Sequence, residues 1–285
     1  MRELDVIPRQ DARLNAAEFD DFRRLASTNF GLDLKPGKER LVEARLGKLV
    51  RAGGFGSYGA LYRFIVADST GRSLAALANA LTTNHTAFLR ESAHFDFLRD
   101  SIVPSLKARS RLDLWCAASA TGEEVWTLAC VLNSAVRMPI HIDATDISTR
   151  ALAVAQRGVY DAERCSGLPA QWLSQYFERD SGPPSRYRVN RLLSAQVTFS
   201  RLNLIEPFPT QKKYPVIFCR NVMIYFDPAT QQRVTSRLAE CLEPGGYLFL
   251  GHAESLSRFP TSLEYVRPAV YRKPQGREGH WNKSW

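Results

Sequence analysis

Apolar side chains recur at helical spacing in the first eighty or so residues of the chain. Phe19 and Phe22 lie three residues apart, and Asn15 with Glu18 before them has the spacing of a helix capping box. No strand-like alternation interrupts this part. Together these features predict an all-α N-terminal domain that covers residues 1–82, with helices expected over residues 15–31, 37–52, 58–66 and 74–81.

The pattern changes at Arg111, where short apolar runs begin to alternate with amphipathic helical segments. Because strands joined by crossover helices form a parallel sheet with helices on both faces, residues 83–274 are expected to form a doubly wound α/β domain. The apolar runs predict strands over residues 112–118, 140–147, 216–222 and 247–251. The segments between them predict helices over residues 122–135, 148–158 and 227–246.

This α/β pattern is interrupted in the middle of the domain. The Gly-Pro-Pro sequence at 182–184 predicts a turn, and the segments 187–189 and 196–200 beyond it alternate in polarity. We therefore expect a small antiparallel insertion, a β-subdomain of about residues 178–201. The end of the chain, residues 275–285, lacks apolar periodicity and is expected to be a disordered tail.

Composition narrows the class of protein. The 285 residues include 38 Lys and Arg against 29 Asp and Glu, a formal net charge of +9, which favours nucleic acid, an anionic membrane surface or a carboxylate-rich protein as partner. The start of the chain lacks the apolar segment of a signal peptide, and no run reaches the roughly 18 apolar residues of a membrane span. Five scattered cysteines predict neither a disulfide framework nor a zinc site, and they favour the reducing cytoplasm.

The loop after the first expected strand, residues 117–124, has small side chains that let a ligand approach the backbone. Only Gly122 remains of a dinucleotide-binding glycine pattern. Glu123 and Glu124 would repel a phosphate but tolerate a cation, or they simply favour the helix dipole. Asp146 ends the second strand, where an acidic side chain binds ribose hydroxyls or caps the next helix. This combination fits a nucleoside-containing ligand, either NAD or S-adenosylmethionine.

Polar residues also follow the third expected strand, in the segment CRNVMIYFD at 219–227. Arg220 and Asn221 would be costly to bury without partners, so they contact a ligand or form a structural ion pair. Tyr225 follows, where a substrate would lie over the sheet edge. The other polar candidates are Asn203, which either contacts a base or forms a turn, and a cluster beside the domain boundary: Asn84, Thr86 and Arg90.

The helix expected over residues 37–52 is rich in Lys and Arg. Its basic face is either simply solvated or docks an acidic surface. The five histidines show no metal-ligand spacing, so no metal is expected. No Gly-x-Ser-x-Gly motif or Ser/His/Asp set supports hydrolase chemistry.

Seven segments together resemble the chemotaxis receptor methyltransferases, the CheR family. In chain order they are TTNHTAFLRES (82–92), LWCAASATGEEVWTLA (114–129), ATDIS (144–148), RGVY (157–160), NL (203–204), IFCRNVMIYFD (217–227) and LFLGHAES (248–255). The resemblance implies an all-α domain linked to a Rossmann-like, S-adenosylmethionine-dependent methyltransferase domain with an antiparallel β-subdomain. It also implies methylation of glutamates on the cytoplasmic helical bundle of chemoreceptors.

The resemblance further implies site residues. Arg90 and Tyr225 would lie closest to the transferred methyl group, as catalytic residues. The basic face would dock the acidic methylation region of the receptor through Arg45, Lys48 and Arg51, and the β-subdomain of some members captures a pentapeptide at the receptor C-terminus. S-adenosylmethionine, and the product S-adenosylhomocysteine, would contact Asn84, Thr86, Arg90, Glu124, Asp146, Asn203, Leu204, Arg220 and Asn221.

Leu89, Val125 and Trp126 depart from the family pattern, but they lie beside the contact positions. A non-catalytic module that senses cofactor or binds receptors is an alternative, which the intact contact residues disfavour. A nucleic-acid methyltransferase is less favoured, because the chain has only Gly-Pro-Pro-Ser at 182–185 where an NPPY-like motif would be needed. An NAD oxidoreductase is more distant still. We expect a cytoplasmic monomer that neither binds nucleic acid nor inserts into a membrane.

Overall fold

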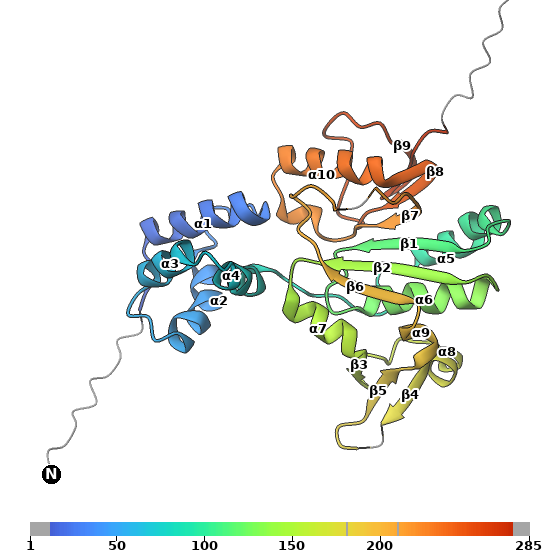
Figure 1. Ribbon diagram of the computed structural model, residues 1–285, viewed down its shortest axis with the longest axis horizontal. Helices are drawn as coiled ribbons and strands as arrows, with labels where there is room; N and C mark the ends of the chain where they lie inside the picture. Colours follow the sequence, from blue (N-terminus) through green and yellow to red (C-terminus); the bar gives the residue numbers. More distant parts are fainter. Residues whose placement is uncertain (1–11, 181, 210, 276–285) are drawn as a thin grey trace, which may run out of the picture. The chain divides into compact units, whose positions relative to one another are not determined.

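The computed structural model describes residues 12–180, 182–209 and 211–275 (Figure 1). The chain divides into two compact units, Met1–Thr82 and Thr83–Trp285. Apart from its first residue, the tail expected at 275–285 lies outside the described residues. No helix in the described part of the chain has the length and apolar character needed to cross a membrane.

The described part of the first unit is helical, as predicted. The capping box forms: the Asn15 side chain accepts a hydrogen bond from the backbone N–H of Glu18, whose carboxylate accepts from the N–H of Asn15. Gly31 ends that helix in the left-handed conformation. Phe22 and Leu46 are fully buried and belong to the apolar core of this unit. Its helices are α1 (Ala16–Phe30), α2 (Glu39–Ala52), α3 (Tyr58–Ala67) and α4 (Arg72–Leu81).

A seven-stranded sheet with the order β6-β2-β1-β7-β8-β10-β9 forms the frame of the second unit. Strands β6, β2, β1, β7 and β8 are parallel, whereas β10 is antiparallel to both of its neighbours. This confirms the α/β class. The strands are β1 (Leu112–Ala117), β2 (Ile140–Asp146), β6 (Val197–Arg201), β7 (Tyr214–Phe218), β8 (Leu242–Phe249), β9 (Glu264–Arg267) and β10 (Val270–Arg272).

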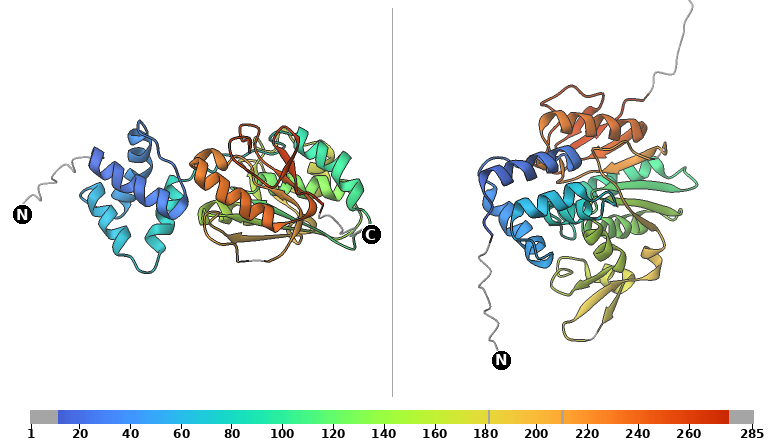
Figure 2. Two further views of the ribbon diagram at one scale, coloured as in Figure 1. Left: turned by 90° about the horizontal axis from the view of Figure 1, so that it is seen from above. Right: turned by 60° about the vertical axis from the view of Figure 1, so that its left-hand side comes forward.

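Helices cover both faces of this sheet (Figure 2). Side chains alternate between the two faces along each strand, and both sets are apolar, so each face has to be covered. Leu114 and Cys116 of β1 belong to one apolar cluster, and Trp115 and Ala117 belong to the other. The first cluster includes residues of α5 (Ala93–Phe97), η1 (Leu98–Ile102), η2 (Val103–Leu106) and α6 (Glu123–Ala135), and the second includes residues of α10 (Pro228–Cys241). Helix α7 (Thr149–Arg157) follows β2.

A separate three-stranded antiparallel sheet, ordered β3-β5-β4, forms the expected β-subdomain. Its composition differs from the prediction. The segment 196–200 forms β6, which pairs with β2 in the main sheet, because Val197 and Phe199 pack on the main core. The third strand of the insertion comes from earlier in the chain. The elements of this region are β3 (Val159–Asp161), α8 (Ala170–Tyr176), β4 (Phe177–Asp180), β5 (Arg186–Val189) and α9 (Arg191–Ser194).

Helix α10 is shorter, and strand β8 longer, than the sequence pattern predicts. The helix ends at Cys241, and the Pro-Gly-Gly sequence at 244–246, the end of the helix expected over residues 227–246, lies inside β8. The pairing with β7 shifts at this point, from Tyr214 opposite Leu242 to Val216 opposite Tyr247. A Cβ atom on Gly246 would lie 3.1 Å from the carbonyl oxygens of Tyr214 and Pro215, so glycine permits this irregular pairing.

Candidate functional site

Polar residues gather where the five parallel strands end. A loop follows β1, Asp146 ends β2, Asn203 comes shortly after β6, Arg220 follows β7, and Glu254 lies beyond β8. The carboxyl ends of parallel strands lie at one edge of a sheet, which is where open α/β domains bind ligands. The topology therefore places these five segments at one candidate site.

The loop after β1 is folded back onto the end of β2. The N–H groups of Ala118 and Ser119 donate to the Thr145 carbonyl at 2.8 and 2.9 Å, and the N–H of Ala120 donates to Asp146 Oδ2 at 2.8 Å. Ala118 and Ala120 have φ values of 109° and 46°, a region that disfavours larger side chains. Small residues thus let the loop backbone line the site.

Asp146 is 8% exposed, and its carboxylate accepts hydrogen bonds from the loop after β1 and from the loop after β2. Its second oxygen, Oδ1, accepts from the N–H of Ser148 at 2.8 Å. Burial raises the pKa of Asp146, against the opposing effect of the backbone N–H donors. Ser148, rather than Asp146, caps α7 by accepting from the N–H of Ala151, and it also accepts from Asn84 Nδ2 at 3.2 Å. The predicted residues Asn84 and Asp146 are therefore joined through Ser148.

The Arg220 guanidinium is the centre of a buried ion-pair network. Its side chain is fully buried and donates to Glu124 Oε2 at 2.9 Å, to Glu91 Oε2 at 2.8 Å and to the carbonyl of Arg90 at 2.7 Å. Burial raises the pKa of Glu124, while the charge of Arg220 opposes that shift. The sequence leaves two roles open for Arg220, a ligand contact or a structural ion pair, and the structure shows the ion pair. Through it, Arg220 brings the backbone of Arg90 close to Glu124.

Glu91 was not predicted, although it belongs to this network. Its Oε1 accepts from Asn221 Nδ2 at 3.1 Å, and its Oε2 accepts from the backbone N–H of His252 at 3.2 Å as well as from Arg220. Burial opposes the ionisation of Glu91, but hydrogen bonds from Arg220 and Asn221 outweigh it and lower the pKa to about 2. The sequence feature that could have pointed to Glu91 is that it belongs to the segment 82–92, one of the seven that resemble the family.

Glu254 was also missed. Its buried carboxylate accepts from the N–H groups of Gly251, Asn221 and Ile224 at 2.5, 2.9 and 3.3 Å. These bonds hold Asn221, whose φ is 58°, and the short helix η3 (Met223–Tyr225). Glu254 thereby fixes the segment that carries Tyr225. The sequence feature that could have pointed to Glu254 is that it belongs to the segment 248–255, one of the seven that resemble the family.

The remaining predicted residues occupy varied positions. Asn203 forms the turn that was its alternative role, because its side chain bonds to Glu206 Oε1 at 2.8 Å and to the N–H of Ile205 at 3.4 Å. Leu204 is buried in the second apolar cluster. The Arg90 side chain is 33% exposed and donates to the His85 carbonyl at 3.1 Å. Thr86 and Tyr225 are half-buried.

The three predicted docking residues lie on α2 of the other unit. Lys48 and Arg51 are exposed, as a docking role requires. Arg45 is half-buried and donates to the carbonyl of Leu81 at the end of α4. Arg45 therefore connects two helices of its own unit. If it also docks the receptor, it does so while its guanidinium donates to the Leu81 carbonyl.

Two family models match the chain. The model for the CheR methyltransferase all-alpha domain matches residues 17–82, and that for the CheR methyltransferase SAM-binding domain matches residues 84–271. The chain is 36% identical to a chemotaxis protein methyltransferase of Borreliella burgdorferi, over 88% of this chain and 92% of that protein. It is 34% identical to one from Salmonella typhimurium, over 92% of both chains. Chemotaxis protein methyltransferase 2 of Pseudomonas aeruginosa is 35% identical, over 93% and 96%.

Proposed function

The chain belongs to the CheR methyltransferase family, and on that premise we propose that it methylates glutamate side chains of chemoreceptors to give methyl esters. Membership makes it an S-adenosylmethionine-dependent methyltransferase of chemotaxis. The choice of glutamate is our proposal. The observation that supports it best is the Arg220 network, which holds the backbone of Arg90 beside Glu124 at the carboxyl edge of the sheet.

The residues at this edge fit S-adenosylmethionine better than a dinucleotide. The N-terminus of α6, where a pyrophosphate would bind, carries the buried carboxylates Glu123 and Glu124. Glu123 is paired with Arg164, and Glu124 with Arg220. Asp146 has acceptor capacity left for ribose hydroxyls, because a carboxylate has about four lone-pair sites. The bound cofactor supplies an electrophilic methyl group on its sulfonium.

The incoming glutamate needs no general base. Its unperturbed pKa of about 4.3 leaves it ionised at pH 7, so the protein has to orient and partly desolvate it. We assign the orienting role to the Arg90 guanidinium, which is 33% exposed, donates a hydrogen bond to the His85 carbonyl, and lies 4.0 Å from Glu91 Oε1, beyond hydrogen-bond distance. Tyr225, held by the η3 turn, would donate a hydrogen bond to the carboxylate or border the methyl group.

Incubation with methyl-labelled S-adenosylmethionine and receptor-bearing membranes tests this reaction. We expect label that mild base releases as methanol, which identifies a methyl ester. Label that is stable to base, or no label on the receptor, would contradict the proposal. The variants Arg90→Ala and Tyr225→Phe should lower turnover more than they weaken cofactor binding. Intact turnover in both, with normal cofactor affinity, would show that the assigned roles are wrong.

We further propose that the exposed Lys48 and Arg51 of α2 dock the acidic methylation region of the receptor. A carboxylate-rich helical surface is the complementary partner for such a face. Such docking gives these basic side chains a protein partner, without nucleic acid. A soluble monomer in the cytoplasm would meet this region of a receptor directly.

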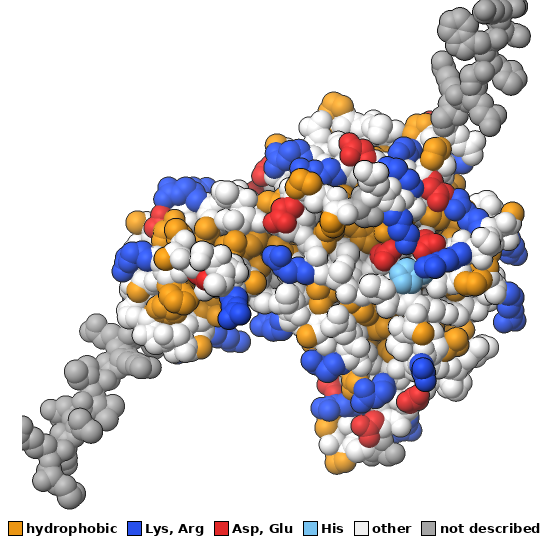
Figure 3. Space-filling model, viewed as in Figure 1, with side chains coloured by type: hydrophobic (Ala, Val, Ile, Leu, Met, Phe, Trp, Pro, Cys, Tyr) orange, Lys and Arg blue, Asp and Glu red, His pale blue; other side chains and the backbone are white. Residues whose placement is uncertain are grey.

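The β-subdomain is the candidate site for a receptor C-terminal pentapeptide. Within the described residues β4 pairs with β5 alone, so its outer edge can accept an added strand. Charged side chains of both signs cover this part of the surface (Figure 3). Titration with a peptide of the receptor's last five residues tests the tether, and a receptor lacking those residues should then be methylated more slowly.

A further inference from the structure

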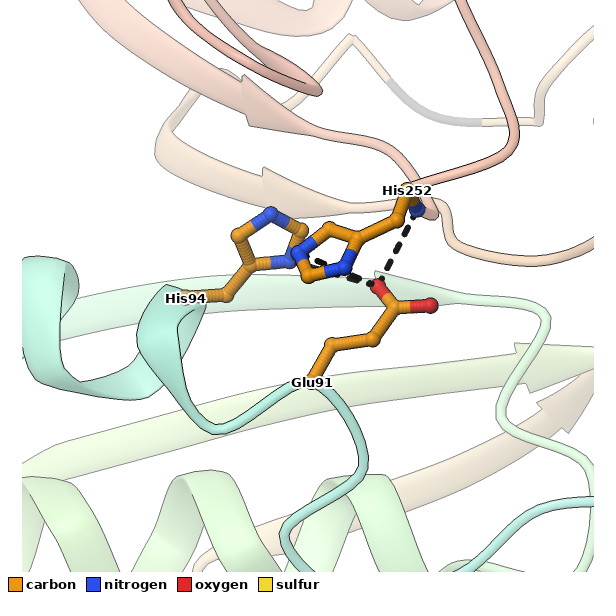
Figure 4. A group of neighbouring side chains, drawn as sticks. All are labelled: Glu91, His94 and His252. Atoms are coloured by element: carbon orange, nitrogen blue, oxygen red, sulfur yellow. Dashed lines mark hydrogen bonds and ion pairs between the residues drawn. The ribbon is translucent and has the colours of Figure 1, made fainter.

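Two histidines lie beside Glu91 and have no part in the proposed reaction (Figure 4). Glu91 and His94 lie three residues apart, just before and within α5, whereas His252 follows β8, so two distant segments of the chain supply the group. Glu91 Oε2 is 3.7 Å from His94 Nδ1 and 3.9 Å from His252 Nε2. The two imidazole rings meet edge to face, with centroids 4.7 Å apart.

His94 is buried without a matching hydrogen-bond partner. It is 1% exposed, and among the described residues neither ring nitrogen makes a hydrogen bond of standard geometry, although the Pro268 carbonyl is close enough to affect the ring. Burial lowers its pKa to about 4, helped by the charges of Arg220 and His252 and opposed by Glu91 and the Pro268 carbonyl. A buried ring nitrogen without a well-formed hydrogen bond is available as a metal ligand.

His252 completes the group from the solvent side. Its side chain is 51% exposed, so the imidazole can change rotamer at little cost in packing. One potential ligand atom from each of Glu91, His94 and His252 lies within 4.8 Å of the other two. The ligand atoms around a tetrahedral ion lie closer to one another than 4.8 Å, because each metal–ligand bond is only about 2.0–2.2 Å long. Rotation of the exposed His252 side chain can bring its nitrogen nearer to the other two ligand atoms.

We propose that Glu91, His94 and His252 bind one divalent transition-metal ion, with zinc the best match. Two imidazoles and a carboxylate form a known three-ligand set for zinc, and water takes the fourth position. Imidazole nitrogens favour Zn²⁺, Cu²⁺ or Ni²⁺ over Mg²⁺ or Ca²⁺, which prefer oxygen. The exposed side of His252 leaves room for that water.

Metal binding at this place would inhibit methyl transfer. Glu91 Oε2, the oxygen nearest both histidines, also accepts from Arg220. An ion on that oxygen would weaken the bond to Arg220, which keeps Glu124 and the Arg90 carbonyl as partners. The cation and the guanidinium also repel each other, so the network that positions Arg90 would loosen. The site is thus expected to be regulatory and reversible, rather than a requirement for folding.

Calorimetric titration of the metal-free full-length protein with Zn²⁺, without S-adenosylmethionine, tests binding directly. We expect one ion per chain and an affinity weaker by roughly tenfold or more in His252→Ala, because removing a ligand costs at least as much as removing an outer-shell partner. His141→Ala is the matched control, since His141 is half-buried on β2 and contacts Asp143 instead. His280→Ala controls for a histidine outside the described residues.

Cobalt supplies an independent readout. Co²⁺ in place of zinc should give the visible d–d absorption of a four-coordinate site in wild type and lose it in His252→Ala. Zn²⁺ should also lower methyl transfer by wild type, a chelator should restore it, and His252→Ala should resist the inhibition. Absence of binding, or equal affinity in wild type and His252→Ala, would overturn the metal site. Because binding is measured without substrate or cofactor, either result leaves the proposed methylation to its own test.

Discussion

Arg220 shows how much of the site depends on a single side chain. It bonds to two carboxylates and one backbone carbonyl, and those partners lie about a hundred or more residues earlier in the chain. The side chain is fully buried, so these bonds, together with the Phe95 and Phe218 rings, whose centroids lie 5.3 and 6.0 Å from its guanidinium carbon, compensate its charge. Arg220 therefore acts on the reaction by positioning the segment of Arg90 and Glu91.

Replacing Arg220 by methionine should destabilise the second unit by about 3–5 kcal/mol, because it leaves Glu124 buried without its counter-ion. Arg109→Met is the matched control, since Arg109 pairs with Glu243 on the surface and should cost about 1 kcal/mol or less. Denaturant unfolding of both variants measures the difference. Equal effects would mean that Arg220 contributes no more than a surface ion pair.

At the residue scale, the sequence identified polar positions better than their roles. Arg220 and Asn221 were expected because polar groups at a buried strand end need partners. Their partners Glu91 and Glu254 were not, since a carboxylate in a loop looks the same in the sequence whether it is solvated or buried. Only the packing of distant segments shows that Glu254 collects three backbone N–H groups.

At the scale of elements, the turn from β1 into α6 is held by packing against α7. Gly122 has a φ of 95°, and a Cβ atom there would lie 2.8 Å from Ala155 Cβ and 2.9 Å from the Tyr160 hydroxyl. This close approach places the N-terminus of α6 against α7 and against β3 of the β-subdomain. The position therefore requires glycine both for its backbone and for its lack of a side chain.

Gly122→Ala should cost about 2–4 kcal/mol of stability, since backbone strain adds to a clash that rigid neighbours cannot relieve. Gly37→Ala separates the two effects: φ is 90°, but nothing lies within 4 Å of the added carbon, so only about 1–2 kcal/mol is expected. Urea denaturation gives both values, and cofactor titration should show weaker binding only for Gly122→Ala. A loss for Gly122→Ala no larger than that for Gly37→Ala would rule out the packing effect.

Strand β6 shows the limit of pattern at this scale. Alternating polarity predicts a half-buried strand, and residues 197–201 do form one. The same pattern suits the edge of either sheet, so the choice of β2 as partner depends on contacts of Val197 and Phe199 with the main core. Likewise, Pro-Gly-Gly marks a helix end in most sequences, yet here it lies in the irregular pairing of β8 with β7.

At the scale of the whole molecule, the residues proposed for receptor binding and those proposed for methyl transfer lie in different units. The basic residues proposed for docking belong to the helical unit, while the residues proposed for the cofactor and the transferred methyl group belong to the α/β unit. Binding of the receptor and binding of the cofactor should therefore respond to different substitutions.

The double variant Lys48→Glu/Arg51→Glu tests this separation. We expect the KM for receptor to rise roughly tenfold or more, because like charges would then face an acidic partner, while cofactor affinity stays unchanged. Lys35→Glu/Arg72→Glu changes the net charge by the same amount, at two exposed positions of the same unit outside α2, and is the matched control. Initial rates at several receptor concentrations give the KM. A similar rise for Lys35→Glu/Arg72→Glu would point to overall charge rather than to the face of α2.

The sequence by itself determined the two-part organisation, the α/β class, the family and most of the polar positions at the sheet edge. It could do so because periodicity, strand-end chemistry and short motifs are local properties of the chain. The tertiary structure decided which sheet holds β6, that Arg220 is an ion-pair centre, and that His252 lies beside Glu91 and His94. Those features depend on residues far apart in sequence, and their energies arise only when folding removes them from water and sets them against one another.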